Sequence, residues 1–306
     1  MEVLYFVEKI RTPFLDFFFS TVTHLGEETF FIILGIIFFW CVNKKEGYYL
    51  LTVGFLGTIL SQFLKLFFRV PRPWVKDKNF TIVESARAEA TGYSFPSGHT
   101  QSAVGIFGGI ARWNAQKWLR ITGIVVCVLV SFSRLYLGVH TPLDVGVGAV
   151  ISIVLIFVFY PLIHKCFKKK NCMRILFLSI IGMCVAHLCF ASFYNFPKDA
   201  QTENIIHGIE NAYKMLGCTI GVYIVFEIDS RYTNFETDGN FLCQLLKLLL
   251  GAIPLIAIKS GLKEPLLTLF DGSYVANSVR YLILVIFVGC VWPLTFKWFK
   301  KITTKR

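Results

Sequence analysis

The sequence predicts an all-α polytopic membrane protein. Of its 306 residues, 55% are hydrophobic and only 16% are charged, and the mean hydropathy is +0.61. A soluble domain carries roughly 25% charged residues, which a chain of this length would need to cover its surface. The same composition excludes disordered chains, coiled coils and disulfide-stapled secreted modules. Apolar stretches long enough to cross a bilayer recur along the whole chain.

The apolar segments can be justified in chain order. Residues 3–24 mix charged with aromatic residues, which predicts an interface-lying amphipathic helix or a weak first span. Residues 29–42 are short for a span of about 20 residues, so we expect this helix to extend back through Gly26. Further spans are predicted at 48–68, 98–113, 119–138, 143–164, 174–194, 209–226, 241–258 and 279–299. Gly251 and Pro254 interrupt one of them, which is tolerated when neighbouring helices satisfy the freed backbone groups.

Basic residues predict the orientation in the membrane. The net charge is +12, and basic clusters occur at 44–45, 112–120, 165–174 and 297–306. With alternating spans all four clusters fall on one face, which the positive-inside rule makes cytoplasmic. The loop 227–240 should share that face although it is acidic, because acidic residues count little in this rule. The opposite face receives residues 69–97, the turn around His140, and the loops 195–208 and 259–278.

Other readings of the charge and of the cysteines are less favoured. A nucleic-acid partner is not expected, because no basic stretch is interleaved with stacking aromatic residues in a soluble module. The nine cysteines lie mostly in apolar stretches without a Cys-x-x-Cys spacing, so we expect buried hydrophobic side chains and neither a disulfide framework nor a metal site. The N-terminus lacks the features of a cleaved signal peptide.

The first candidate motif runs from Lys65 to Arg72 and Pro73. Seven residues separate the two cations, about two helical turns, so both side chains could lie on one side of a helix. The alternative is a snorkelling lysine followed by basic interface anchors.

The second candidate motif is Phe95-Pro-Ser-Gly-His-Thr, followed by a helix rich in small residues. Ser97 can cap that helix, and Gly98 lets its backbone approach a ligand closely. A helix N-terminus attracts anions such as phosphate, and His99 stands where it could donate a proton. The alternative is an ordinary capped helix start.

The third candidate motif joins Ser133 and Arg134 to His140 and Asp144. The carboxylate of Asp144 can accept Nδ1–H of His140 and leave Nε2 free as a nucleophile. Thr141 and Asp144 also have the spacing of a capping box. One aspartate cannot make both contacts fully, and we expect the histidine contact.

Taken together, Lys-x6-Arg-Pro, Pro-Ser-Gly-His and Ser-Arg-x5-His-x3-Asp resemble the signature of the type-2 phosphatidic acid phosphatase superfamily. This superfamily includes membrane lipid phosphatases, glucose-6-phosphatases and vanadium haloperoxidases. The resemblance covers about residues 20–165 and implies a six-helix phosphatase core with the active site in residues 1–165. Residues 174–306 would add about four transmembrane helices of unknown role.

The resemblance also implies catalytic roles. His140 would attack phosphorus and form a phospho-histidine, with Asp144 stabilising the imidazolium. His99 would protonate the leaving oxygen and then activate water. The phosphoryl oxygens would be bound by Lys65, Arg72, Ser97, Gly98 and Arg134. No metal or other cofactor is expected, because the cations take the metal's role.

The membrane setting suggests a lipid phosphate or diphosphate as substrate, with membrane lipids around it. Phosphatidic acid, phosphatidylglycerophosphate, a polyprenyl diphosphate and a sphingoid-base phosphate all fit. One alternative is a haloperoxidase using vanadate at the same site. Another is a non-enzymatic lipid transporter or lipid-binding protein, against which the intact His140, His99 and Asp144 argue.

The second half of the chain carries His187 and Lys247 within apolar segments, where ionisable residues are costly. A snorkelling lysine and a histidine bonded to a carbonyl are the structural alternatives to a functional role. This region could shape substrate access or a homodimer contact. Composition favours a bacterial inner membrane with an extracytoplasmic active site, and a eukaryotic endomembrane stays open as the alternative.

Overall fold

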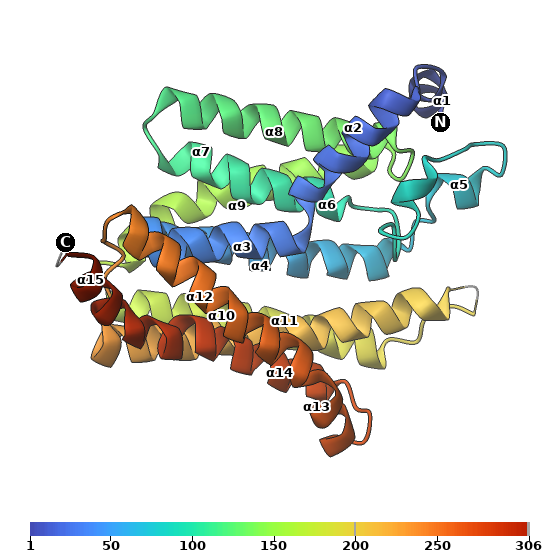
Figure 1. Ribbon diagram of the computed structural model, residues 1–306. Helices are drawn as coiled ribbons and strands as arrows, with labels where there is room; N and C mark the ends of the chain where they lie inside the picture. Colours follow the sequence, from blue (N-terminus) through green and yellow to red (C-terminus); the bar gives the residue numbers. More distant parts are fainter. Residues whose placement is uncertain (199, 305–306) are drawn as a thin grey trace. The chain divides into compact units, whose positions relative to one another are not determined.

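The computed structural model describes residues 1–198 and 200–304, and this part of the chain is helical without strands. Six helices are long and apolar enough to cross a membrane, or seven if the bent pair Pro13–Gly26 and Glu28–Val42 forms one span. The expected all-α polytopic membrane fold is confirmed (Figure 1). Two other predicted spans are helical but fall outside this set, because 98–113 is broken by a π turn and 209–226 carries polar residues in its first half.

The chain divides into two compact units, each described here by itself. Unit 1 comprises Met1–Leu34, Tyr49–Leu162 and Asn195–Gly208, and unit 2 comprises Gly35–Tyr48, Ile163–Tyr194 and Ile209–Arg306. The helices of the first half are α1 (Glu2–Lys9), α2 (Pro13–Thr23), η1 (His24–Gly26), α3 (Glu28–Ile37), η2 (Phe38–Val42), α4 (Lys44–Phe68), α5 (Pro73–Lys76), η3 (Glu84–Ala86), α6 (Gly98–Ala103), η4 (Val104–Gly108), α7 (Gly109–Trp113), α8 (Lys117–Tyr136) and α9 (Pro142–Cys166).

The N-terminal segment 3–24, predicted as an interface-lying helix or a weak first span, forms the two helices α1 and α2, and a bend follows them. Thr12 caps α2 by accepting Leu15 N–H, and the chain bends by 54° after Gly26. The expectation that the following helix extends back through Gly26 is therefore wrong, since α3 begins at Glu28. A Cβ on Gly26 would lie 2.8 Å from the carbonyl oxygen of His99, so glycine permits a close approach to the second motif.

Unit 1 is held together around α8. Helices α2, α6 and α7 pack along it, and Phe19, Tyr136, Leu137 and Val139 form a buried cluster at its C-terminal end. Arg11 Nε donates to the carbonyl of Tyr136 at 2.9 Å, which ties the N-terminal segment to this cluster. The end of α8 is thereby fixed immediately before the turn that carries His140.

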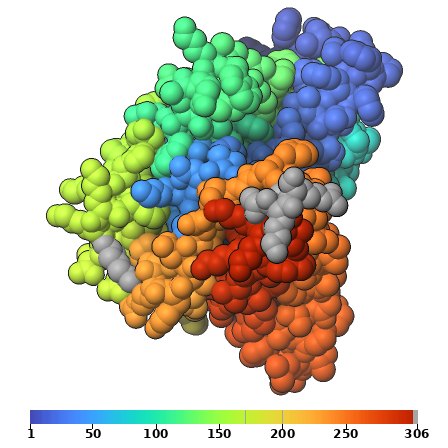
Figure 2. Space-filling view, turned by 60° about the vertical axis from the view of Figure 1, so that its left-hand side comes forward, coloured from blue at the N-terminus to red at the C-terminus, as the bar shows by residue number. Residues whose placement is uncertain are grey.

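Unit 2 is built on aromatic packing. Its further helices are α10 (Lys170–Phe193), α11 (Thr202–Ile228), η5 (Asp229–Thr233), α12 (Phe241–Gly261), α13 (Lys263–Leu269), α14 (Val275–Ile286), η6 (Phe287–Val291), η7 (Trp292–Thr295) and α15 (Phe296–Thr304). Trp40, Trp292 and Phe296 pack edge to face or tilted against one another. The atoms of α12, α14 and α15, coloured orange to red, form a continuous surface in Figure 2, and α12 contacts both other helices.

The second half settles one open alternative and corrects one expectation. Lys247 is fully buried and not at the surface, and its Nζ donates to the carbonyls of Thr237 and Asp238 at 3.2 and 3.1 Å. Cys166 and Cys172 form a disulfide with their Cα atoms 4.8 Å apart, so not all cysteines are isolated hydrophobic side chains. Chain reversal between α9 and α10 brings these two together, which the spacing of six residues did not reveal.

Candidate active site

The structure brings all the predicted site residues together in unit 1. Lys65 lies in the last turns of α4, Arg134 near the end of α8, and Asp144 in the first turn of α9. The second and third motifs are joined directly, because Ser97 N–H donates to the carbonyl of Asp144 at 2.9 Å. The side chains that carry charge or a nucleophile are buried: Lys65, Arg72, Arg134, His140 and Asp144 are between 1% and 8% exposed.

Arg72 determines which nitrogen of His140 carries the proton. Its Nη1 donates to His140 Nε2 at 2.9 Å. A guanidinium has only donors and stays protonated, so Nε2 must act as the acceptor and the proton resides on Nδ1. The lone pair at Nε2 therefore accepts the Arg72 bond in this structure, and a phosphoryl group must take the place of Nη1 before Nε2 can attack phosphorus.

The surroundings of His140 keep the imidazole neutral. Burial lowers the pKa of His140 well below its usual value, and Arg72, Arg134 and Lys65 lower it further. A backbone hydrogen bond with Ser94 acts in the opposite direction. A neutral imidazole at ordinary pH is the form that can attack an electrophile.

Asp144 closes the capping box at the start of α9 and does not bond His140. Thr141 N–H donates to Asp144 Oδ2 at 2.7 Å, and Asp144 N–H donates to Thr141 Oγ1 at 3.3 Å, so the capping box is closed in both directions. The distance from His140 Nδ1 to Asp144 Oδ2 is 3.6 Å, longer than a hydrogen bond. The expected direct hydrogen bond is therefore wrong, because other donors already hold that carboxylate oxygen.

One of those donors is Ser94, which the motifs do not include. Its hydroxyl donates to Asp144 Oδ2 at 2.6 Å and lies 3.4 Å from His140 Nδ1. Ser94 is completely buried. A serine two residues before Pro96 carries no recognisable pattern, and its only signal is a polar residue next to the second motif.

The residues just before Ser94 also organise the site, through carbonyls that no sequence motif reports. Lys65 Nζ donates to the carbonyl of Tyr93 at 2.5 Å. Arg72 donates from Nε to the Gly92 carbonyl at 3.1 Å and from Nη2 to the Thr91 carbonyl at 2.6 Å. Gly92 has a φ of +70°, which glycine adopts without strain and which turns successive carbonyls toward the cations.

The start of α6 forms the remaining wall of the site. Ser97 caps the helix, its Oγ accepting from Thr100 N–H at 3.4 Å and from the Thr100 hydroxyl at 3.0 Å. A Cβ on Gly98 would meet nothing within 4 Å, so open space lies above this residue. Among the described residues, His99 Nε2 and Arg134 Nε are buried without a hydrogen-bond partner, which leaves polar groups able to bind an oxyanion.

An apolar groove runs along α8 and α9 of unit 1. It has a volume of about 860 Å³, with Arg112 and Arg120 among its lining residues at one end and Leu135 and Val145 at the other. Arg120 and Leu135 are fifteen residues apart on one helix, or roughly 22 Å. Val145, which lines this end of the groove, is the residue after Asp144 in the chain.

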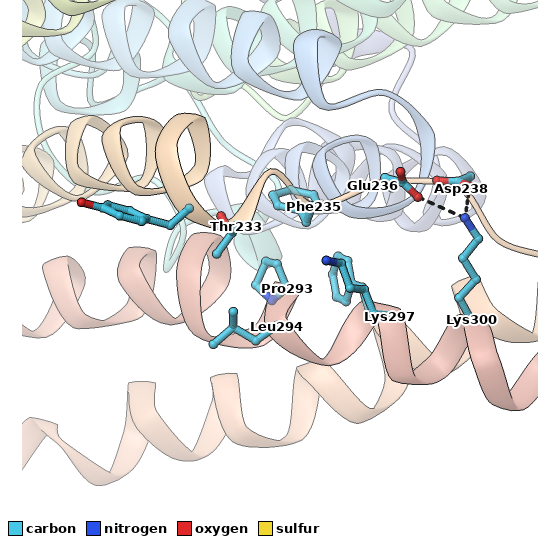
Figure 3. Close-up of a pocket in the computed structure, with 10 residues that line it drawn as sticks. Thr233, Phe235, Glu236, Asp238, Pro293, Leu294, Lys297 and Lys300 are labelled. Carbon is cyan, nitrogen blue, oxygen red and sulfur yellow. Dashed lines mark hydrogen bonds and ion pairs between the residues drawn. The ribbon is translucent and has the colours of Figure 1, made fainter.

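A second pocket lies in unit 2 and contains none of the predicted site residues. It is lined by residues of η5, the following loop and the helices around Pro293 (Figure 3). Lys300 crosses it and bonds Glu236 at 3.0 Å and Asp238 at 2.5 Å. Lys300 thus pairs with both carboxylates that line this pocket.

Nothing in the described residues suggests a metal centre, because no group of three or more histidine, cysteine, aspartate or glutamate side chains there could hold an ion. The cations Lys65, Arg72 and Arg134 are the positive charges of the site.

Comparison with known proteins agrees with the three motifs. The profile of the PAP2 superfamily matches residues 46–168, and that of the "PAP2 superfamily phosphatase, transmembrane extension" matches residues 213–305. A probable sphingosine-1-phosphate phosphatase of Dictyostelium discoideum is 35% identical over 160 residues, which cover 48% of this chain and 38% of the relative. Sphingosine-1-phosphate phosphatase 1 of Rattus norvegicus is 29% identical over 181 residues, covering 57% of this chain and 41% of the relative.

The chain thus spans about two fifths of the length of these two relatives. Phosphatidylglycerophosphatase B of Bacillus subtilis (strain 168) is matched more completely: it is 31% identical over 161 residues, covering 48% of this chain and 75% of the relative. The expected family resemblance is confirmed, and the chain belongs to the PAP2 superfamily.

Proposed function

We propose that this protein is an integral-membrane phosphatase that removes phosphate from a lipid phosphate or diphosphate through a phospho-histidine intermediate. The observation that carries the proposal is the contact between Arg72 Nη1 and His140 Nε2 at 2.9 Å. It presents an unprotonated, nucleophilic nitrogen beside a cation that can bind the phosphoryl group. The same proposal takes residues 1–165 as the phosphatase core and residues 174–306 as additional helices.

In the first step, Nε2 of His140 attacks phosphorus, and the bond from phosphorus to the lipid oxygen breaks. His99 gives its proton to that leaving oxygen. Arg72, Arg134 and Lys65 neutralise the phosphoryl oxygens, with Ser97 and the backbone at Gly98 as further donors. Stabilisation of this charge is most of the catalysis in phosphoryl transfer, so no metal is needed.

In the second step, water attacks phosphorus and the bond from phosphorus to Nε2 breaks. His99 accepts the proton of that water, and inorganic phosphate leaves. The imidazole returns to its neutral form, with the proton on Nδ1, which the geometry around Arg72 favours.

The lipid character of the substrate rests on the apolar groove and on the membrane setting. An apolar groove of about 860 Å³ in the same unit, lined by Val145 among others, has room for a hydrocarbon chain. The names of the relatives, sphingosine-1-phosphate phosphatase and phosphatidylglycerophosphatase, also describe enzymes acting on lipid phosphates.

We further propose that the site lies on the extracytoplasmic side of a bacterial inner membrane. The second half could support a homodimer.

A phosphate-release assay on the purified protein tests this function. We expect release from lipid phosphates that differ in headgroup and chain length, and loss of turnover and of covalent labelling in His140→Ala. His99→Ala should impair lipid substrates far more than an aryl phosphate, whose phenolate leaves without a proton. Lipid movement between leaflets without phosphate release would favour the transporter alternative, and halide oxidation with vanadate and peroxide would favour a haloperoxidase.

A further inference from the structure

Ser94 lies at the junction of all three motifs. Its N–H donates to the carbonyl of Val70 at 2.8 Å, which fixes the backbone close to the first motif. Its hydroxyl reaches both Asp144 Oδ2, at 2.6 Å, and His140 Nδ1, at 3.4 Å. All three of these residues are at most 1% exposed, so bulk water has little access to the contacts.

The protons around this hydroxyl can be assigned. A serine hydroxyl has one proton and two lone pairs. An ionised carboxylate only accepts, so the hydroxyl proton points to Asp144. Arg72 makes Nε2 of His140 the acceptor, so the proton of the imidazole is on Nδ1, facing the free lone pairs of Ser94 Oγ. A directional chain results, from Nδ1–H of His140 to the hydroxyl of Ser94 to the carboxylate of Asp144.

We propose that Ser94 is a positioning residue for the phosphoryl transfer proposed above, its hydroxyl linking Asp144 to His140. Attack on phosphorus leaves the imidazole with a positive charge. Before the attack, the Ser94 hydroxyl orients Nδ1–H of His140. As the charge develops, the same hydroxyl transmits the stabilising effect of the Asp144 carboxylate to Nδ1–H. The 3.4 Å separation shortens as that charge develops, since catalytic hydrogen bonds commonly tighten in the transition state.

Two observations separate this role from a purely structural one. Thr141 N–H already occupies Asp144 Oδ2 at 2.7 Å and closes the helix cap without Ser94. The backbone of Ser94 is anchored through its own N–H to Val70, independently of the side chain. Removing the hydroxyl therefore leaves both the cap of α9 and the course of the loop in place.

Kinetics of Ser94→Ala and Ser94→Thr test the proposal. We expect kcat to fall about 10- to 100-fold in Ser94→Ala with KM little changed, because the hydroxyl acts on the developing charge and not on substrate binding. Ser94→Thr keeps the hydroxyl and should restore most of the turnover. The matched control is Ser61→Ala, whose hydroxyl is also buried in unit 1 but has no hydrogen-bond partner among the described residues. Unchanged kcat in Ser94→Ala would overturn the proposal.

A double-mutant cycle adds a readout that a folding defect would not mimic. If the hydroxyl acts through Asp144, adding Ser94→Ala to Asp144→Asn costs much less than Ser94→Ala costs in the wild-type background. Multiplicative losses would show that the two residues act independently and would overturn the linkage.

Anion binding keeps the test independent of the substrate. Orthovanadate can become five-coordinate and bond His140 Nε2, whereas inorganic phosphate needs only the cations. We expect Ser94→Ala to weaken orthovanadate binding about 10-fold or more and to leave inorganic phosphate binding unchanged. If wild-type protein releases no phosphate but shows this difference, the proposed function fails and the role of Ser94 stands. Equal orthovanadate affinities in the two proteins would overturn the role of Ser94 alone.

Discussion

At the scale of single residues, His140 is held from both sides of its ring. Arg72 donates to Nε2 at 2.9 Å, while Ser94 and Asp144 lie 3.4 and 3.6 Å from Nδ1. The cation thus selects the tautomer, and the hydroxyl and carboxylate face the remaining proton. Because the guanidinium also anchors to three backbone carbonyls, its orientation is fixed before any substrate binds.

Arg72→Lys should lose more activity than the conserved charge suggests. An ammonium cannot donate at once to the carbonyls of Thr91, Gly92 and Val139 and to His140, as the planar guanidinium does. We expect kcat/KM to fall about 100-fold, or about 3 kcal/mol of transition-state stabilisation. Steady-state kinetics on one lipid phosphate measure the effect. Near-wild-type turnover would remove Arg72 from the proposed phosphate site.

The protonation of His140 should be displaced to acidic pH. Its pKa is lowered by burial and by the cations Arg72, Arg134 and Lys65, so the ring stays neutral as the pH falls below its ordinary value of 6.5. Below pH 6.5 the unfolded chain therefore binds a proton at this histidine that the folded protein does not, so His140 lowers the stability as the pH falls from 6.5 toward the folded-state pKa. NMR titration of histidine-labelled protein, with His140→Gln to assign the signal, measures the midpoint. A midpoint at or above 6.5 would contradict this sign.

At the scale of elements, the site depends on how closely α9 approaches the loop before α6. Gly148 lies one helical turn beyond Asp144, and a Cβ there would lie 2.6 Å from the carbonyl oxygen of Ser97. Glycine allows the backbone contact that joins the second motif to the third. On the same helix, a Cβ at Gly146 would meet nothing within 4 Å.

Gly148→Ala should therefore damage the site, and Gly146→Ala should not. The added methyl group forces the Ser97 carbonyl or the whole helix to shift, and we expect turnover to fall at least about 10-fold, with a loss of roughly 1–3 kcal/mol in stability. Gly146→Ala should retain activity and raise the unfolding temperature slightly, since alanine favours the helix. Thermal unfolding and phosphate release measure both effects. Equal turnover and equal unfolding temperatures in the two variants would contradict the close approach of α9 to the Ser97 carbonyl.

At the scale of the whole molecule, the basic loops predict the orientation in the membrane. By the positive-inside rule we expect residues 112–120 and 165–174 in the cytoplasm and the loop 74–95 on the opposite side. All the candidate site residues belong to unit 1, which also includes Asn195–Gly208 from the second half of the chain. Gln201 N–H donates to the Tyr93 hydroxyl at 3.1 Å, so this later segment braces the loop that holds Lys65.

Cysteine labelling tests the orientation. Lys78→Cys and Lys168→Cys, both at exposed positions, are introduced separately into a cysteine-depleted background. An impermeant thiol reagent should label position 78 from outside and position 168 only after the membrane is opened. Labelling of both from the same side would refute the topology.

The sequence by itself determined the membrane class, most of the helices and the identity of the charged and nucleophilic residues. These follow from local composition and from the chemistry that each side chain carries wherever it lies. Only the tertiary structure decided the partners: the cap contact of Asp144, the hydroxyl of Ser94, the three carbonyls at Thr91–Tyr93, the bend at Gly26 and the pairing of Cys166 with Cys172. Ser94 and Asp144 are 50 residues apart in the chain. A difference of a few tenths of an ångström in the distance between donor and acceptor decides whether a hydrogen bond forms. Distances of that kind are set by how helices pack and not by spacing along the chain.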